Sequence, residues 1–166
     1  MTFGQIPPGV GVFLDANSLI YHFTNDATFG KSCTQLVKRI EQKTLSGFTS
    51  AHCLADVAHR LMTIEAISVF GWPRPGIASR LRKNHSEIPK LTVYQQAIAS
   101  VALLGIQILP ITSALVEAAT ILCQKYQLLT GDGLIVAVMQ HQALSHLASN
   151  DPDFDRVPGL TRFSPV

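Results

Sequence analysis

The stretch that decides the fold is Val10-Gly11-Val12-Phe13-Leu14-Asp15, a short and almost continuous apolar run that ends on a carboxylate. Runs of this kind are typical of a parallel strand that is covered on both faces. A similar run near the C-terminus, His146-Leu147-Ala148-Ser149, is followed by Asn150-Asp151. We therefore expect two buried strands, each with an acidic residue just beyond its carboxyl end.

Between these strands, apolar residues spaced three and four positions apart predict helices, and two short runs predict further strands. The expected helices cover residues 19–23, 31–43, 51–62, 77–85, 93–104, 114–126 and 133–141. The expected further strands cover residues 47–50 and 106–111. The cluster Gly71-Trp72-Pro73-Arg74-Pro75-Gly76 predicts a loop inside the domain. Strands that alternate with helices predict an α/β protein whose parallel sheet is covered on both faces.

Composition limits the class of protein. The chain has 166 residues, of which 47% are hydrophobic and 14% charged, so we expect one folded domain over residues 1–166. The net charge of +2 is too small for a general polyanion binder. Three widely spaced cysteines, without a C-x-x-C pair, argue against a zinc ribbon and a secreted disulfide framework. With no apolar stretch long enough to cross a bilayer and no signal-peptide pattern, we expect a soluble cytoplasmic protein.

The few acidic residues are placed where parallel α/β proteins bind ligands. Asp15 and Asp151 follow expected strands, and ligands bind outside the carboxyl ends of such strands. Asp132 begins an expected helix that packs on the sheet, and Asp56 lies in the middle of another helix among apolar neighbours. Taken singly, each aspartate has a structural explanation as a helix cap or turn residue. Taken together, converging carboxylates repel each other, and oxygen-bound Mg²⁺ or Mn²⁺ removes that cost.

Other well-known sites are missing from the chain. Gly9-x-Gly11 precedes a strand and therefore does not form a dinucleotide-binding turn. The sequence has no phosphate-binding G-x-x-x-x-G-K-[ST], no G-x-S-x-G and no H-E-x-x-H.

Four segments, in order, resemble the motifs of PIN domains such as the VapC-type toxins. These segments run from Val12 to Tyr21 with Asp15-Ala16-Asn17, from Thr49 to Val57 with Ala55-Asp56, from Thr130 to Ala137 with Gly131-Asp132-Gly133, and from Leu147 to Phe154 with Ser149-Asn150-Asp151-Pro152-Asp153, followed by Val157-Pro158-Gly159-Leu160. The resemblance implies a three-layer α/β/α PIN-like fold with a central, mostly parallel sheet of four to five strands. It also implies a metal-dependent ribonuclease, often the toxin of a toxin–antitoxin pair.

The resemblance assigns the site residue by residue. It implies that Asp15, Asp56, Asp132 and Asp151 are catalytic, with Asp15, Asp132 and Asp151 as ligands of Mg²⁺ or Mn²⁺. Supporting polar groups would be Asn17, Ser149 and Asp153. Two positions depart from the family pattern: Asp56 is one methylene shorter than the usual Glu, and Gly133 stands where Ala is common. Gly133 is expected to loosen its helix by about 0.5–1 kcal/mol.

An acidic site must still attract RNA. Five of the 13 basic residues surround the Pro-rich loop and predict an RNA-guiding face: Arg74, Arg80, Arg82, Lys83 and Lys90. A solvated helix face explains the same charges. The apolar composition further predicts a homodimer, and an apolar groove near the acidic rim that takes a small antitoxin protein.

Two other functions compete with a nuclease. One is a PIN fold that binds RNA or acts as a scaffold without catalysis, its site weakened by Asp56. The other is a Mg²⁺-dependent phosphatase or receiver-like domain, which is disfavoured because Asp15-Ala16-Asn17 lacks the D-x-D of such phosphatases.

Overall fold

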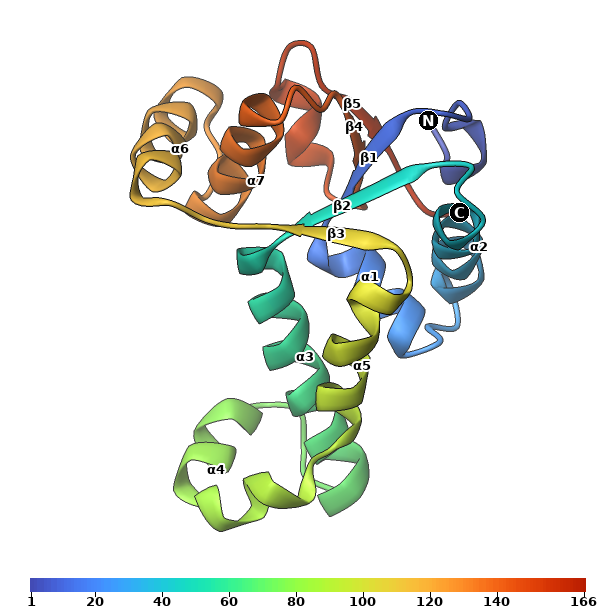
Figure 1. The fold of residues 1–166 in the computed structure, drawn as a ribbon. Helices are drawn as coiled ribbons and strands as arrows, with labels where there is room; N and C mark the ends of the chain where they lie inside the picture. Colours follow the sequence, from blue (N-terminus) through green and yellow to red (C-terminus); the bar gives the residue numbers. More distant parts are fainter.

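Strand β1 (Gly11–Leu14) lies in the middle of a five-stranded sheet in the computed structural model, which describes all of residues 1–166 (Figure 1). The strand order is β3-β2-β1-β4-β5, and every neighbouring pair is parallel. The other strands are β2 (Ser46–Ser50), β3 (Ile106–Leu109), β4 (His146–Ala148) and β5 (Thr161–Phe163). The expected parallel α/β sheet is confirmed, here with five strands.

Helices cover both faces of this sheet (Figure 1). One face carries α1 (Ala16–Phe23), α2 (Gly30–Glu41), α3 (Ala51–Phe70) and α5 (Val93–Leu103), and the other carries α6 (Ser113–Tyr126) and α7 (Thr130–His141). Connections between parallel strands are right-handed, so the direction in which the chain moves along the sheet decides which face a helix covers. From β1 to β3 the chain moves in one direction, and from β3 to β4 it moves back in the other. Helices α6 and α7, which connect β3 to β4, therefore lie on the opposite face. The reversal leaves a crevice between β1 and β4, where such sheets bind ligands.

The register brings the ends of β1 and β4 together. Val12, Phe13 and Leu14 are completely buried, as the continuous apolar run predicts for a central strand. Leu14 pairs with Ala148, and the backbone N–H of Asp15 donates to the Ala148 carbonyl over 3.1 Å. The residues that follow both strands therefore emerge at one edge of the sheet.

Helix α3 extends further than the sequence predicted. It runs to Phe70, eight residues beyond the expected end, and Gly71 terminates it in a left-handed conformation with φ of 64°. Its last turns project from the sheet together with α4 (Ile77–Lys83), the 3₁₀ helix η2 (His85–Lys90) and the start of α5. We call this projection, residues 63–92, the arm. It has a small core of its own, made by Ala66, Ile77, Leu81 and Leu91.

A buried carboxylate attaches the arm to α5. Glu65 of α3 is 9% exposed and accepts hydrogen bonds from the backbone N–H groups of Thr92, Val93 and Tyr94, over 2.8 to 3.0 Å. These are donors at the N-terminus of α5 that have no partner within the helix, and a negative charge is favourable there. Glu65 thereby caps α5 from a neighbouring helix.

The C-terminal segment contains two elements that the sequence did not reveal. The 3₁₀ helix η3 (Pro152–Arg156) follows β4, and the three residues of β5 complete the sheet. Two further 3₁₀ helices, η1 (Phe3–Gln5) at the start of the chain and η2 in the arm, were also not predicted. None of the helices is long and apolar enough to span a membrane, and all three cysteines are free.

Candidate active site

Asp15 is the most deeply placed carboxylate of the site. It precedes α1, is 7% exposed, and accepts a 2.7 Å hydrogen bond at Oδ2 from the hydroxyl of the buried Ser149. The Asn17 amide reaches the same oxygen at 3.5 Å. Burial raises the pKa of Asp15, although the hydrogen bond from Ser149 opposes the shift. The carboxylate is thus held in one orientation, at some cost to its ionised form.

Ser149 also joins Asp15 to Asp151. Its Oγ accepts the backbone N–H of Asp151 over 3.1 Å while its hydroxyl donates to Asp15. The Asp151 carboxylate in turn accepts the backbone N–H of Asp153 at 2.9 Å, which begins η3. The tight turn after β4 therefore fixes Asp151 beside Asp15.

Asp132 reaches the same place from the other face of the sheet. It lies in the first turn of α7, which begins at Thr130, three residues before the predicted start. Its pKa is raised to about 6, first by burial and then by repulsion from Asp151, Asp15 and Asp153. Repulsion of this kind requires the carboxylates to be near one another. Asp15, Asp132 and Asp151 all line one groove.

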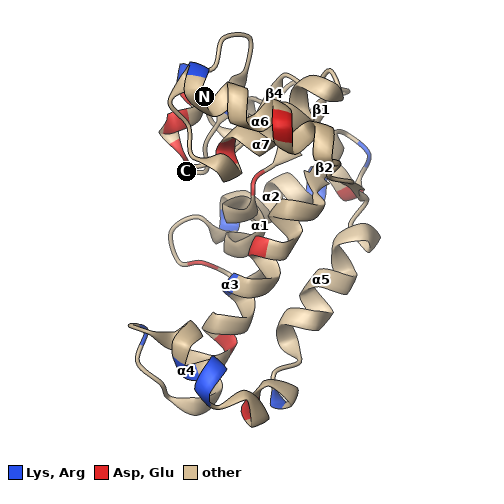
Figure 2. Ribbon diagram, turned by 90° about the vertical axis from the view of Figure 1, so that its left-hand side faces the viewer, with Lys and Arg blue, Asp and Glu red and all other residues tan.

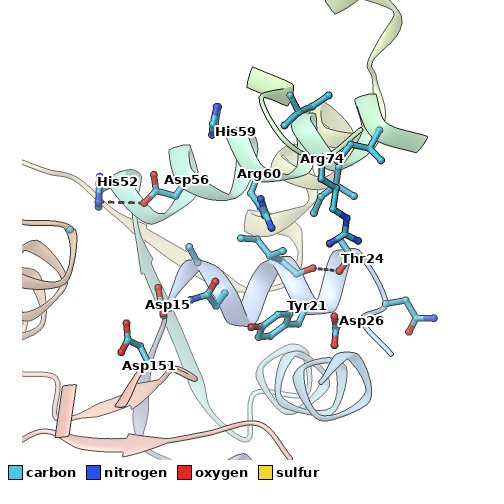
Figure 3. A pocket seen from close by; sticks show the side chains of 18 of the residues that line it. Asp15, Tyr21, Thr24, Asp26, His52, Asp56, His59, Arg60, Arg74 and Asp151 are labelled. Atoms are coloured by element: carbon cyan, nitrogen blue, oxygen red, sulfur yellow. Dashed lines mark hydrogen bonds and ion pairs between the residues drawn. The ribbon is translucent and has the colours of Figure 1, made fainter. Parts of the chain in front are cut away.

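Asp56 faces this groove from α3 but stands apart from the other three carboxylates. Its side chain is 59% exposed, despite the apolar neighbours in the sequence, and its Oδ2 pairs with Nε2 of His52 at 3.4 Å (Figure 3). It is not among the carboxylates that raise the pKa of Asp132. The shorter side chain therefore occupies the rim of the groove.

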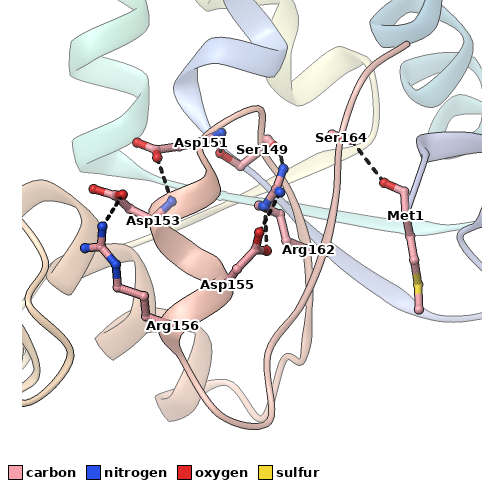
Figure 4. Close-up of polar contacts among 8 residues, drawn as sticks. All are labelled: Met1, Ser149, Asp151, Asp153, Asp155, Arg156, Arg162 and Ser164. Carbon is pink, nitrogen blue, oxygen red and sulfur yellow. Dashed lines mark hydrogen bonds and ion pairs between the residues drawn. The ribbon is translucent and has the colours of Figure 1, made fainter.

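Asp153 differs from its neighbours because an arginine already neutralises it. Its Oδ1 accepts from Nη2 of Arg156 at 2.7 Å (Figure 4). Nη1 of Arg156 donates to the Gln127 carbonyl at 2.9 Å. A second pair, Arg162 with Asp155, holds the Ser149 carbonyl at 3.3 Å. Asp153 thus supports the loop that positions Asp151, and it does not line the groove.

The predicted basic face divides into two groups. Only Arg74 lines the groove. The other four belong to the outer part of the arm, where the Lys and Arg residues around α4 gather (Figure 2). Arg80 lies over the Trp72 ring at 5.9 Å and Lys90 pairs with Glu87 at 2.6 Å, while Arg82 and Lys83 are exposed on α4.

The sequence argument missed His52 and Arg60, which both line the groove. They lie four residues before and four residues after Asp56, so the three side chains share one face of α3. This spacing in the sequence indicates that His52 and Arg60 face the same site as Asp56.

Mg²⁺ or Mn²⁺ suits these donors. No cationic side chain pairs with Asp15, Asp132 or Asp151, since the four ion pairs involve other acids. The side chains do not form a complete cage, because no three His, Cys, Asp or Glu groups are close enough to hold a metal by themselves. Mg²⁺ commonly uses only one or two carboxylates, together with waters and substrate phosphates. The donor set therefore fits such an ion.

Comparisons with known proteins agree with this geometry. The sequence model of the PIN domain family matches residues 12–160. The chain therefore belongs to the PIN domain family. No curated protein sequence matches it.

Solved structures of similar fold include a toxin and a toxin–antitoxin complex. VapBC2 from Rickettsia felis, bound to a DNA fragment from its promoter, matches with a TM-score of 0.59 and 13% identity over 94% of this chain and 99% of that one. VapC20 from Mycobacterium tuberculosis, a toxin that cleaves the sarcin–ricin loop, gives 0.57 and 18% over 87% and 92%. A toxin–antitoxin complex from Klebsiella pneumoniae gives 0.55 and 20% over 90% and 95%. At these identities the likeness concerns the fold.

Proposed function

We propose that this chain is a Mg²⁺- or Mn²⁺-dependent ribonuclease that cleaves RNA phosphodiester bonds. One observation carries the proposal: three carboxylates without cationic partners line one groove at the carboxyl edge of the sheet in a chain of the PIN family. Such a cluster is costly in an empty site and becomes favourable with a bound cation. When bound, the ion orients and acidifies a water and stabilises charge on the scissile phosphate.

The side chains have distinct roles in this proposal. Asp15, Asp132 and Asp151 hold the ion, with Asp15 oriented by Ser149 and Asn17. Asp153 acts indirectly, because Arg156 occupies its carboxylate. Asp56 lies outside the repelling cluster and is the carboxylate available to accept a proton from water.

The test replaces single carboxylates by amides. Asp15→Asn and Asp132→Asn should each slow Mg²⁺-dependent cleavage of a single-stranded RNA by at least about a hundredfold, because the ion's stabilisation amounts to several kcal/mol. Glu117→Gln is the matched control, since Glu117 is exposed on α6, outside the groove. If either aspartate variant cleaves at nearly the wild-type rate in saturating Mg²⁺, the assigned site is wrong.

The second candidate function is a non-catalytic RNA-binding or scaffold module. It is favoured by Asp56, which pairs with His52 and is not among the carboxylates that raise the pKa of Asp132. Asp56→Glu distinguishes the two: in a nuclease it should tighten Mn²⁺ binding or raise activity. A large loss of activity with unchanged Mn²⁺ affinity would mean that the pocket is adapted to Asp. A wild-type protein that binds RNA but cleaves none with Mg²⁺ or Mn²⁺ is the outcome expected of a scaffold.

We further propose a cytoplasmic homodimer that pairs with an antitoxin. Individual apolar side chains are exposed, among them Leu103 of α5 at 86% and Ile121 of α6 at 66%, and each is available to a partner chain. Near the carboxylates, Phe13 and Leu19 are fully buried, whereas Ile20 and Tyr21 line the groove. The groove would take an antitoxin segment that inserts a basic side chain among the carboxylates. Light scattering at micromolar concentration tests the dimer, and co-purification with the product of an adjacent small gene tests the antitoxin.

A further inference from the structure

The groove extends well beyond the carboxylates. It has a volume of about 750 Å³, and one face of α3 forms a wall of it: His52, Asp56, Arg60, Ile64 and Ile67. The spacing of four, four, four and three residues keeps these side chains in line. At a rise of about 1.5 Å per residue, the wall from His52 to Ile67 is roughly 22 Å long. This is much longer than a single scissile phosphate requires.

Two arginines line the groove away from Asp15 and Asp151. Arg60 comes from the middle of the α3 wall, one helical turn beyond Asp56, and Arg74 comes from the loop that joins α3 to α4 and lies near Thr24, at the C-terminal end of α1 (Figure 3). Both are exposed, and neither takes part in an ion pair. Asp26 also lines the groove, but its Oδ1 accepts the backbone N–H groups of Thr28 and Phe29 at 2.9 Å. The two guanidinium groups are therefore available to an anion.

Apolar side chains also line the groove. Ile20 comes from α1, Ile64 and Ile67 follow Arg60 along α3, and Tyr21 presents an aromatic ring beside them. The ring of Tyr21 is tilted by 45° against Phe29, with the centroids 5.1 Å apart, which limits its motion. A surface of this kind suits the faces of unpaired bases, which a duplex keeps stacked inside.

We propose that Arg60 and Arg74 form a distal phosphate site, which seats a single-stranded RNA along the groove while another phosphate lies at the carboxylates. The inference rests on the proposed nuclease function and adds the path and length of its substrate. With about 3.4 Å per stacked nucleotide, 22 Å accommodates roughly six nucleotides. Shorter RNAs reach the carboxylates without engaging both arginines. A site outside the reacting bond positions the strand and carries no sequence preference.

The experiment measures RNA binding separately from cleavage. Fluorescence anisotropy with oligonucleotides of two to ten residues is carried out in EDTA, in an Asp132→Asn background, so that the RNA stays intact. Arg60→Gln/Arg74→Gln is compared with Lys31→Gln/Lys38→Gln, which removes the same charge from exposed positions on α2 outside the groove. Circular dichroism checks that both double variants are folded.

Two changes are expected in the arginine variant. The gain in affinity between four and eight nucleotides should disappear. The slope of log K against log salt should fall by about 1.4, because each phosphate contact on a single strand contributes about 0.7. Both changes should be independent of RNA sequence, and the lysine control should match the parent.

Several results would overturn the distal site. It is wrong if length dependence and salt slope are unchanged in the arginine variant, or if the parent binds none of the RNAs. It is also wrong if the variant keeps RNA affinity but loses a co-purifying antitoxin, since the arginines would then serve a protein. The outcome is separable from catalysis: loss of binding in the arginine variant, together with a wild-type chain that cleaves no RNA, supports the distal site and rejects the nuclease.

Discussion

The acidity of Asp132 has a consequence for stability that can be measured. Its pKa is about 6 in the folded chain, against 3.8 for an ordinary aspartate, because of burial and repulsion from Asp151, Asp15 and Asp153. A carboxyl whose pKa is raised on folding binds its proton more tightly in the folded state. The stability that this proton provides is complete below pH 3.8 and is lost as the pH rises through about 6. The metal-free protein should therefore weaken between these two values.

The magnitude follows from the size of the shift. Roughly two pKa units correspond to about 3 kcal/mol, and solvent screening of a half-buried carboxyl reduces this to about 1–2 kcal/mol. Asp132→Asn removes the charge, so at pH 7.5 in EDTA the variant should be more stable than the wild type by this amount. For a domain of this size that is a rise of about 3–6 °C in Tm.

Thermal and urea unfolding between pH 4 and pH 7.5 checks the prediction. The advantage of Asp132→Asn should shrink toward zero at pH 4, and Glu117→Gln should follow the wild type throughout. Added Mn²⁺ should stabilise the wild type more than the variant, because ligand binding to the folded state alone raises its stability. The reasoning would be refuted if the stabilities of the wild type and Asp132→Asn changed in parallel with pH, or if the variant were less stable at pH 7.5. Either result would mean that favourable contacts of the Asp132 carboxylate outweigh the repulsion from its neighbours.

Three further substitutions test how the elements around the site are held. Gly133→Ala should destabilise the fold by about 1–3 kcal/mol in urea unfolding, in spite of the better helix propensity, because its Cβ would collide with Cys123 Sγ. Glu65→Gln should lower the free energy of unfolding by about 1–3 kcal/mol, because the charge that caps α5 is lost. Faster amide hydrogen exchange at the N-terminus of α5 would show the loss of this cap. Asp155→Asn should lower the free energy of unfolding by about 0.5 kcal/mol at neutral pH. The hydrogen bond from Arg162 lowers the pKa of Asp155, so the difference between variant and wild type should vanish as the pH falls through that pKa.

Much of the fold was predictable because burial on both faces of β1 leaves a clear apolar run. The end of α3 was missed because Thr63, Ile64, Ile67 and Val69 are β-branched and disfavour a helix locally. The core of the arm and the cap supplied by Glu65 compensate for this preference. Strand β5 has only three residues, too few for a periodic pattern, and its pairing with β4 defines it.

The departure at Gly133 shows how a local rule is reversed by packing. The sequence predicted a loosened first turn, because glycine is a poor helix former. In the structure, α7 approaches α6 so closely that a Cβ at this position would lie 2.9 Å from the Ala119 carbonyl oxygen. Glycine permits this contact, and the close packing keeps Asp132 at the groove. What appeared as a weakness of one helix is a condition for the placement of its carboxylate.

The part of the candidate site that follows the ends of parallel strands was predictable from the sequence. Asp15 and Asp151 follow β1 and β4, and parallel pairing brings them together whatever the rest of the chain does. Asp56 and Arg60 are different, because a helical residue reaches a site only if its face of the helix points there. The apolar stripe of α3, with Val57 and Leu61 buried, sets that face: the residues one position earlier, Asp56 and Arg60, are turned together toward the groove. The rotation that carries Asp56 to the rim therefore also carries Arg60 into the groove, where we propose that it contacts the substrate strand.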